Sequence, residues 1–172
     1  MKLVNLHKSF EKQKVLEGYN LEIKQTGITK IEGPSGSGKT TILRIISGLE
    51  TADQGEFVDI PKNISFMFQE DRLFPWYSAV KNIEIATKKT EKEILNVLSK
   101  LGISNTTAVK LPSELSGGEK RRVALVRTLL KDAELYILDE PYTGLDDETK
   151  KLAENLIKEL AKTKPILLVS HG

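Results

Sequence analysis

Short apolar runs alternate along the chain with stretches whose apolar residues recur at helical spacing. This alternation is typical of an α/β fold with a largely parallel sheet. Two of the runs, in the regions of residues 135–138 and 166–170, are almost continuously apolar, as expected of strands that are covered on both faces. We predict strands at Lys2–Leu6, Tyr19–Ile23, Gly27–Glu32, Ile64–Phe68, Leu135–Leu138 and Ile166–Ser170.

Four segments have the helical spacing, and cap or turn residues bound them. Thr90–Glu93 matches a capping box, and the acidic pair Asp146–Asp147 favours a helix N-terminus. Gly48 and Gly102 favour helix ends. We predict helices from within Gly36–Thr41 to Ser47, from Thr90 to Leu101, from about Ser116 to Leu130, and from near Asp146 to a point before Pro165. The expected buried residues are Ile94, Val97, Leu98 and Leu101 in the second helix and Leu152, Leu156 and Leu160 in the fourth.

The segment from about residue 70 to residue 130 contains two of these helices and no convincing strand. The predicted strands on either side of it look like parts of one sheet. We therefore interpret the segment as a helical subdomain inserted into an α/β core, and not as a separate domain. With 172 residues, the whole chain 1–172 has the usual size of a single domain.

Composition excludes several classes of protein and site. The chain has no cysteine, so disulfides and cysteine-ligated metal sites are impossible. Its longest apolar runs have four residues, whereas a membrane-spanning helix needs about 20. The first residues contain no long apolar stretch, so we expect no secretory signal.

The charge pattern does not suggest a nucleic-acid partner. The net charge is +2, from 26 basic and 24 acidic residues in mixed order. The densest basic spots are Lys88–Lys89 and Lys120–Arg122, which we interpret as solvated faces of helices or loops.

A glycine-rich stretch, GPSGSGKT, matches the P-loop pattern G-x-x-x-x-G-K-[ST] and lies between a predicted strand and a predicted helix. Its glycines let backbone N–H groups turn toward phosphate oxygens, and the helix N-terminus adds positive potential. Lys39 supplies a charge for the β and γ phosphates, and Thr40 presents a hydroxyl to Mg²⁺. We expect nucleotide contacts from Gly33, Pro34, Ser35, Gly36, Ser37, Gly38, Lys39, Thr40 and Thr41.

The predicted strand Leu135–Leu138 ends in two carboxylates, Asp139 and Glu140. An Asp-Glu pair after a strand is a weak signal alone, but together with a P-loop it resembles the Walker B element. In that element Asp139 would hold Mg²⁺ through water. Glu140 would lie next to the γ-phosphate, where a base orients or deprotonates water.

The P-loop and the two carboxylates are also compatible with nucleotide kinases, GTPases and motor ATPases. The sequence Leu115-Ser116-Gly117-Gly118-Glu119 resembles the signature motif of ABC-type ATPases, the ATP-binding subunits of transporters. A hydroxyl, two glycines and a helix N-terminus resemble a second phosphate cradle. In the family this motif serves the ATP of the partner subunit, so the resemblance implies a head-to-tail dimer around two ATP molecules.

The remaining motifs occur in the family's order. Gln69 resembles the Q-loop glutamine, which links Mg²⁺ and water to the helical subdomain. Asp146 resembles the D-loop aspartate, which touches the partner's site, and His171 resembles the switch histidine, which contacts the γ-phosphate. Lys39, Gln69, Glu140 and His171 would thus carry hydrolysis. Phe10 precedes the P-loop by the interval expected of the aromatic that stacks on adenine, and a place in the core is the alternative.

The resemblance covers nearly the whole chain, from about Lys2 to Gly172, with departures. The stretch between Gly48 and Ile64 is short, so we expect a strand hairpin that is usual in the family to be trimmed. Gly172 stands where an acidic residue is common, and the helices that usually follow are absent from this sequence. We expect less support for the last strand for that reason.

The resemblance implies a P-loop NTPase core with a mainly parallel sheet, antiparallel N-terminal strands and the inserted helical subdomain. It implies an ATP-binding and ATP-hydrolysing subunit that uses ATP and Mg²⁺ and lies peripherally on the cytoplasmic face of the cell membrane. The implied partners are a second ATP-binding subunit and an integral membrane permease.

The stretch Gln69–Trp76 is similar to bacterial importers of small solutes, including anionic ones, which favours import. Phe74, Pro75 and Trp76 either form part of a socket for the permease or belong to the core. Two other functions stay open. One is a soluble ABC protein that acts as a nucleotide-driven clamp, commonly with extensions that this sequence lacks. The other is a small-molecule kinase. A kinase would lack a motif such as Leu115–Glu119, so the presence of this motif counts against it.

Overall fold

Four parallel strands form the central sheet of the computed structural model, which describes residues 1–11, 13–34 and 36–170. The strand order is β3-β7-β6-β5, with β3 at Gly27–Ile31, β5 at Ile64–Met67, β6 at Leu135–Asp139 and β7 at Pro165–Val169. Every residue of β6 and β7 is buried, as expected for inner strands that are covered on both faces. The predicted α/β fold with a mainly parallel sheet is confirmed.

A second, antiparallel sheet contains the N-terminal strands. β1 (Lys2–Phe10) lies between β2 (Gln13–Glu22) and β4 (Gln54–Val58). The antiparallel N-terminal strands are thus confirmed, but β1 and β2 are longer than predicted because their more polar ends also pair with each other, Lys8 with Leu16 and Ser9 with Lys14. β4 was not predicted: it is exposed along its whole length and is interrupted by a glycine, so no apolar alternation marks it. A single paired strand therefore remains where we expected a trimmed hairpin.

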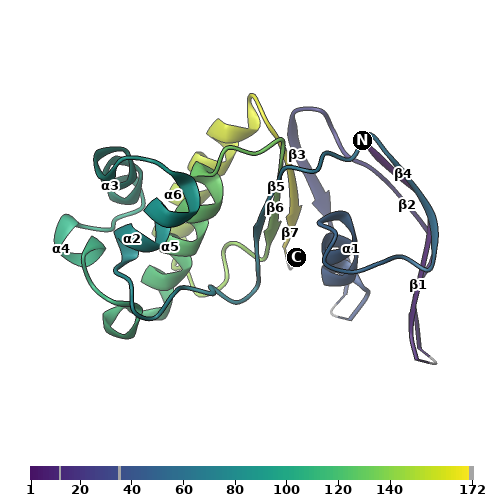
Figure 1. Cartoon of the computed structure of the whole chain (residues 1–172), viewed down its shortest axis with the longest axis horizontal. Helices are drawn as coiled ribbons and strands as arrows, with labels where there is room; N and C mark the ends of the chain where they lie inside the picture. Colours follow the sequence, from purple (N-terminus) through teal and green to yellow (C-terminus); the bar gives the residue numbers. More distant parts are fainter. Residues whose placement is uncertain (12, 35, 171–172) are drawn as a thin grey trace.

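Two hydrophobic clusters lie on opposite faces of the central sheet, because successive side chains of a strand point in opposite directions. Leu135 and Ile137 belong to the cluster with α1 (Lys39–Ile46) and the antiparallel sheet. Tyr136 and Leu138 belong to the cluster with the other helices. Figure 1 shows this order of layers, with α1 between the two sheets and α5 (Gly117–Leu130) and α6 (Asp147–Ala161) on the opposite side of the central sheet.

The chain between β5 and β6 is helical. It contains α2 (Ala79–Thr87), α3 (Glu91–Lys100), α4 (Asn105–Ala108), a 3₁₀ turn at Pro112–Glu114, and α5 (Gly117–Leu130). The prediction of α3 is confirmed together with its capping box, in which Thr90 and Glu93 bond reciprocally. α2 was missed because a fully buried asparagine, Asn82, interrupts its apolar face.

The last helix, α6 (Asp147–Ala161), begins where predicted, but its buried face was predicted incorrectly. The buried residues are Ala153, Ile157 and Ala161. Of the predicted stripe, Leu156 and Leu160 are only partly buried and Leu152 is exposed. Small alanines let the helix lie close to the sheet, so the contact face is centred one position further along than the leucines indicate.

Candidate functional site

The P-loop connects the end of β3 to the start of α1 and wraps around a lysine. Lys39 is 6% exposed, and its Nζ donates hydrogen bonds of 2.7 Å to the carbonyl oxygens of both Gly33 and Pro34. Gly38 precedes the helix with φ 86°, and a Cβ there would approach Val15 Cγ1 to 2.8 Å. A glycine is therefore required at this position. Ser35 lies outside the described residues.

A threonine and an aspartate join the P-loop to the central sheet. Thr40 Oγ1 donates a hydrogen bond of 3.0 Å to Oδ2 of Asp139, the last residue of β6. Asp139 is 1% exposed, and burial raises the pKa of its carboxyl group above the ordinary value. Its Oδ1 is buried without a hydrogen-bond partner among the described residues. This oxygen is thus available as an acceptor.

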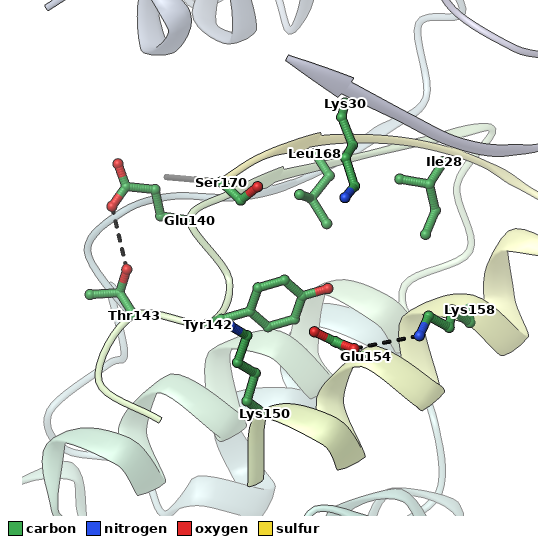
Figure 2. A pocket seen from close by; sticks show the side chains of 10 residues that line it. All are labelled: Ile28, Lys30, Glu140, Tyr142, Thr143, Lys150, Glu154, Lys158, Leu168 and Ser170. Carbon is green, nitrogen blue, oxygen red and sulfur yellow. Dashed lines mark hydrogen bonds and ion pairs between the residues drawn. The ribbon is translucent and has the colours of Figure 1, made fainter. Parts of the chain in front are cut away.

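Glu140 follows at the carboxyl end of the same strand. Its φ of 51° lies in the left-handed region, which is uncommon for a residue with a side chain. The backbone N–H donates to the carbonyl oxygen of Val169 at 3.0 Å, which ties Glu140 to β7. Its Oε2 accepts a hydrogen bond of 3.3 Å from Thr143 Oγ1, shown in Figure 2.

One cleft of about 300 Å³ gathers the predicted residues from four parts of the chain. Its lining comprises Phe10, Val15, Gly36, Gly38, Lys39, Thr40, Thr41, Gln69 and Glu140. Phe10 is 43% exposed, so its alternative interpretation as a core residue is wrong. Its ring centroid lies 4.8 Å from Lys8 Nζ. The structure thus brings one aromatic, one buried cation, one amide and one carboxylate to a single cleft.

The motif Leu115–Glu119 does not line this cleft. Ser116 is the N-cap of α5: its Oγ accepts from the backbone N–H of Glu119 at 3.2 Å, and Glu119 Oε2 accepts from the Ser116 N–H at 2.7 Å. A Cβ at Gly118 would lie 3.3 Å from the carbonyl oxygen of Gly144. The motif therefore packs against the loop before α6, where Asp146 caps the helix by accepting from the Thr149 N–H at 2.8 Å.

Arg121 is the residue that sequence reasoning missed. We predicted solvated side chains at Lys120–Arg122, but Arg121 is 3% exposed. Its guanidinium donates to backbone oxygens in two separate segments, 68–69 and 139–140. No local signal marks it, because the acceptors of this guanidinium lie in segments that are distant from it in the sequence.

The segment after Gln69 is held by side chains from the helices. Arg127 donates to the carbonyl oxygens of Asp71 and Arg72 at 2.6 and 2.8 Å. The aromatic residues that follow lie at the surface: Trp76 is 67% exposed, and Phe74 and Tyr77 are also exposed. The alternative that Phe74 and Trp76 belong to the core is therefore wrong. His171 lies outside the described residues.

These features agree with a comparison against known families. The family model described as "ABC transporter" matches residues 16–143. The chain belongs to this family. The matched range includes the P-loop, the carboxylate pair and the motif Leu115–Glu119.

Individual ABC transporter proteins are similar over nearly the whole chain. The aliphatic sulfonates import ATP-binding protein SsuB 2 of Pseudomonas syringae pv. syringae is 38% identical over 99% of this chain and 63% of its own length. SsuB 3 of Rhodococcus jostii is 37% identical over 98% of this chain and 64% of its own length. The chain thus spans less than two thirds of the length of these relatives.

A solved ABC cassette structure has the same fold. It is a dimeric ATP-binding cassette in a post-hydrolysis state bound to ADP and Pi, and it matches with a TM-score of 0.87 at 29% identity. The match covers 99% of this chain and 88% of the cassette. Within the part of the chain that the structure describes, no helix has the length and apolar character needed to cross a membrane.

Proposed function

We propose that this chain is the ATP-binding and ATP-hydrolysing subunit of an ABC transporter that imports a small solute. The observation that carries the proposal is the convergence of Lys39, Gln69 and Glu140 on one cleft from separate parts of the chain. Family membership and the similarity to ATP-binding import proteins support it. We treat residues 1–172 as one ABC-type domain, with residues 70–130 as its helical part.

Lys39 is the proposed partner of the β and γ phosphates. Its ammonium group already lies across the loop, where two carbonyl oxygens accept its hydrogen bonds. Charged phosphate oxygens form stronger hydrogen bonds than neutral carbonyls, so bound ATP would draw the ammonium away from them. The rest of the P-loop, from Gly33 to Thr41, would contact the phosphates through backbone N–H groups. Phe10, exposed at the cleft, is available for the adenine face.

Thr40, Asp139 and Gln69 are the residues that would hold Mg²⁺. The buried Asp139 Oδ1 has no hydrogen-bond partner among the described residues, which fits an acceptor kept for a cation. Hydroxyl, amide and carboxylate oxygens are the donor types that this ion prefers. When bound, Mg²⁺ neutralises charge that develops on the phosphate oxygens.

Glu140 is the proposed base. The hydrogen bond from Thr143 to Oε2 (Figure 2) orients the carboxylate, and the bond from the Glu140 N–H to the Val169 carbonyl oxygen fixes its backbone. A carboxylate held in this way accepts a proton from water as the water attacks the γ-phosphate. Gln69 is proposed to orient the same water. His171 is proposed to contact the γ-phosphate, on the resemblance alone.

A second ATP-binding subunit is the proposed partner for the motif Leu115–Glu119. Because this motif does not line the described cleft of its own chain, its N-capped helix start is available to another chain's phosphates. Asp146 is proposed to face the same partner. The dimeric state of the similar cassette supports this arrangement.

An integral membrane permease is the proposed second partner, which would place the subunit on the cytoplasmic face of the cell membrane. Phe74, Trp76 and Tyr77 form an exposed aromatic surface suited to such contact, with ring centroids 6.1–6.3 Å apart. Since the similar proteins are named for import of aliphatic sulfonates, organosulfonates are the first substrate class to test. No nucleic-acid partner is proposed.

The test is ATP binding and hydrolysis by the purified chain with Mg²⁺. Lys39→Ala should lower both ATP affinity and turnover, the latter by about 100-fold or more, because the phosphates lose a cation in a confined site. Glu140→Gln should keep ATP affinity and lower turnover by about 10²–10⁴-fold, because an amide does not accept the proton. Lys92→Ala, on the exposed face of α3, is the matched control. Wild-type ATP affinity in Lys39→Ala would refute the P-loop assignment.

Purification of the tagged chain from membranes tests the transport part of the proposal. An integral membrane protein should be recovered with the wild-type chain and lost when Phe74 and Trp76 are both changed to serine. Recovery of soluble proteins alone would favour the nucleotide-driven clamp.

A further inference from the structure

The guanidinium of Arg121 has an unusual set of acceptors. It lies at 3% exposure, on the second turn of α5, five residues after the N-cap Ser116. Four of its five bonds are made to main-chain carbonyl oxygens and one to a carboxylate. The acceptors are Phe68 O and Gln69 O at 2.9 Å each, Asp71 Oδ1 at 3.2 Å, Asp139 O at 2.7 Å and Glu140 O at 2.6 Å.

The two nitrogens divide these acceptors between two segments. Nη1 bonds the segment that carries Gln69, and Nη2 bonds the segment that carries Asp139 and Glu140. A planar guanidinium holds its donors at a fixed separation, so it sets the distance between the two segments. These are the segments that deliver an amide and a carboxylate to the cleft.

The main chain at Glu140 needs such support. Its φ of 51° is unfavourable for a residue with a side chain, and such a conformation persists only where surrounding contacts fix it. Three backbone bonds of Glu140 do so: the N–H donates to Val169 O at 3.0 Å, and the carbonyl oxygen accepts from Arg121 at 2.6 Å and from the Thr143 N–H at 3.2 Å. Loss of Arg121 would leave the Glu140 carbonyl without this charged donor.

One carboxylate forms a direct ion pair with Arg121 among the described residues. Asp71 Oδ1 is 3.2 Å from Nη1. The buried Nε has no hydrogen-bond partner among the described residues. The side chain is therefore positioned by its two terminal nitrogens. This arrangement is expected of a residue whose role is to bridge the two segments.

We propose that Arg121 is a positioning residue that holds Gln69 and Glu140 in the relative position that ATP hydrolysis requires. This inference rests on the proposed ATPase function. Since Arg121 and Ser116 belong to the same helix start, a shift of that helix when a partner engages Ser116 would also move the two segments of the cleft. Arg121 thereby links the motif Leu115–Glu119 to the hydrolytic residues of its own chain.

The first test compares Arg121→Met with Arg121→Gln. Methionine fills the volume without donors, so turnover should fall by about 100-fold, as expected for misplaced catalytic groups. Affinity for a non-hydrolysable ATP analogue should change by less than about threefold, because Arg121 does not line the cleft. Glutamine retains two planar donors, so the turnover of Arg121→Gln should be about tenfold higher than that of Arg121→Met. Lys120→Met is the matched control.

A double-mutant cycle separates positioning from general loss of structure. In the Glu140→Gln background, Arg121→Met should lower the residual turnover by clearly less than the loss of about 100-fold expected in the wild-type background, because one of the two groups that it positions is already disabled. An equal loss in both backgrounds, with no recovery by glutamine, would overturn the proposal. Wild-type turnover in Arg121→Met would overturn it as well.

Hydrogen exchange gives a readout that needs no hydrolysis. Arg121→Met should accelerate exchange of the backbone amides of residues 68–71 and 139–143, while α3 stays as protected as in the wild type. This result would support the positioning role even in a chain that does not hydrolyse ATP, and that inactivity would count against the proposed function alone. Unchanged exchange in both segments would overturn the inference.

Discussion

At the scale of single residues, the P-loop holds one buried cation, Lys39, and bonds one buried carboxylate, Asp139, through Thr40. Lys39 satisfies its ammonium with two carbonyl oxygens, whereas Asp139 receives one bond from Thr40 and keeps one oxygen without a partner that the structure describes. Burial without full compensation is unfavourable for a carboxylate, which is why the pKa of Asp139 is raised. Ionised Asp139 therefore lowers the stability of the fold, while its Oδ1 remains available as an acceptor.

Asp139→Asn should raise the melting temperature measured without Mg²⁺ at neutral pH. A raised pKa means that ionised Asp139 destabilises the fold above the ordinary pKa of the group, and asparagine removes that charge while still accepting from Thr40. Differential scanning calorimetry with ATP and Mg²⁺ should show the reverse order, because the wild type alone gains from the ion. A variant that is less stable without Mg²⁺ would contradict this account of Oδ1.

At the scale of elements, local sequence patterns predicted the helices and strands that are determined by residues close together in the chain. α3 was predicted by its capping box and spacing, and the continuous apolar runs predicted β6 and β7. The P-loop and the two carboxylates after β6 are also local, so most of the cleft could be proposed from the sequence.

Features that depend on tertiary partners could not be predicted in this way. β4 is defined by its pairing with β1, and the buried Asn82 and Arg121 are explained only by the carbonyl oxygens that surround them. Arg121 was predicted to be solvated, and no prediction was made for Asn82. Their burial follows from loops that fold back over the helices.

Asn82→Ala should destabilise the chain by about 2–3 kcal/mol, because it leaves several buried backbone groups without partners. The Asn82 side chain accepts from the Phe74 N–H and donates to the carbonyl oxygens of Phe74, Tyr77 and Ser78. Urea unfolding measures the loss, and the fluorescence of the single tryptophan, Trp76, reports on the same loop. Asn96→Ala, on the exposed side of α3, should cost less than about 0.5 kcal/mol. Equal losses in the two variants would contradict this role of Asn82.

Glu119→Gln should change stability in a pH-dependent manner. The hydrogen bond from the Ser116 N–H lowers the pKa of Glu119, so its ionised form stabilises the fold above the ordinary pKa. That contribution is lost as the pH falls through the lowered pKa. The wild type should therefore be slightly more stable than Glu119→Gln at pH 7, by less than about 1 kcal/mol, and this difference should shrink as the pH falls through the lowered pKa. Urea unfolding at pH 7 and over a series of acidic pH values checks this, and a difference that does not shrink would contradict it.

At the scale of the whole molecule, Leu115–Glu119 does not line the cleft of its own chain. The proposed dimer joins the cleft of each chain to this motif of the other. The two halves of such a site can be disabled separately.

An equal mixture of Ser116→Arg and Lys39→Ala chains should regain hydrolysis that neither has alone. Each mixed dimer has one site with both defects and one with none, so random pairing restores up to about a quarter of wild-type turnover. The measurement is phosphate release before and after mixing. Full activity of Ser116→Arg alone would reject the action of Ser116 on the partner's ATP.

The central sheet separates the core into two clusters, and this separation affects how the sequence can change in evolution. Residues on the side of α1 and residues on the side of α5 and α6 share few contacts, because alternate positions of β6 serve different clusters. Substitutions on the two sides should therefore have additive effects. The helical side can be remodelled for a new partner while the nucleotide side is conserved. Arg121 belongs to the helical side, and it donates to carbonyl oxygens at the carboxyl end of β6, next to the cleft. It is therefore the position at which such independent change is restricted.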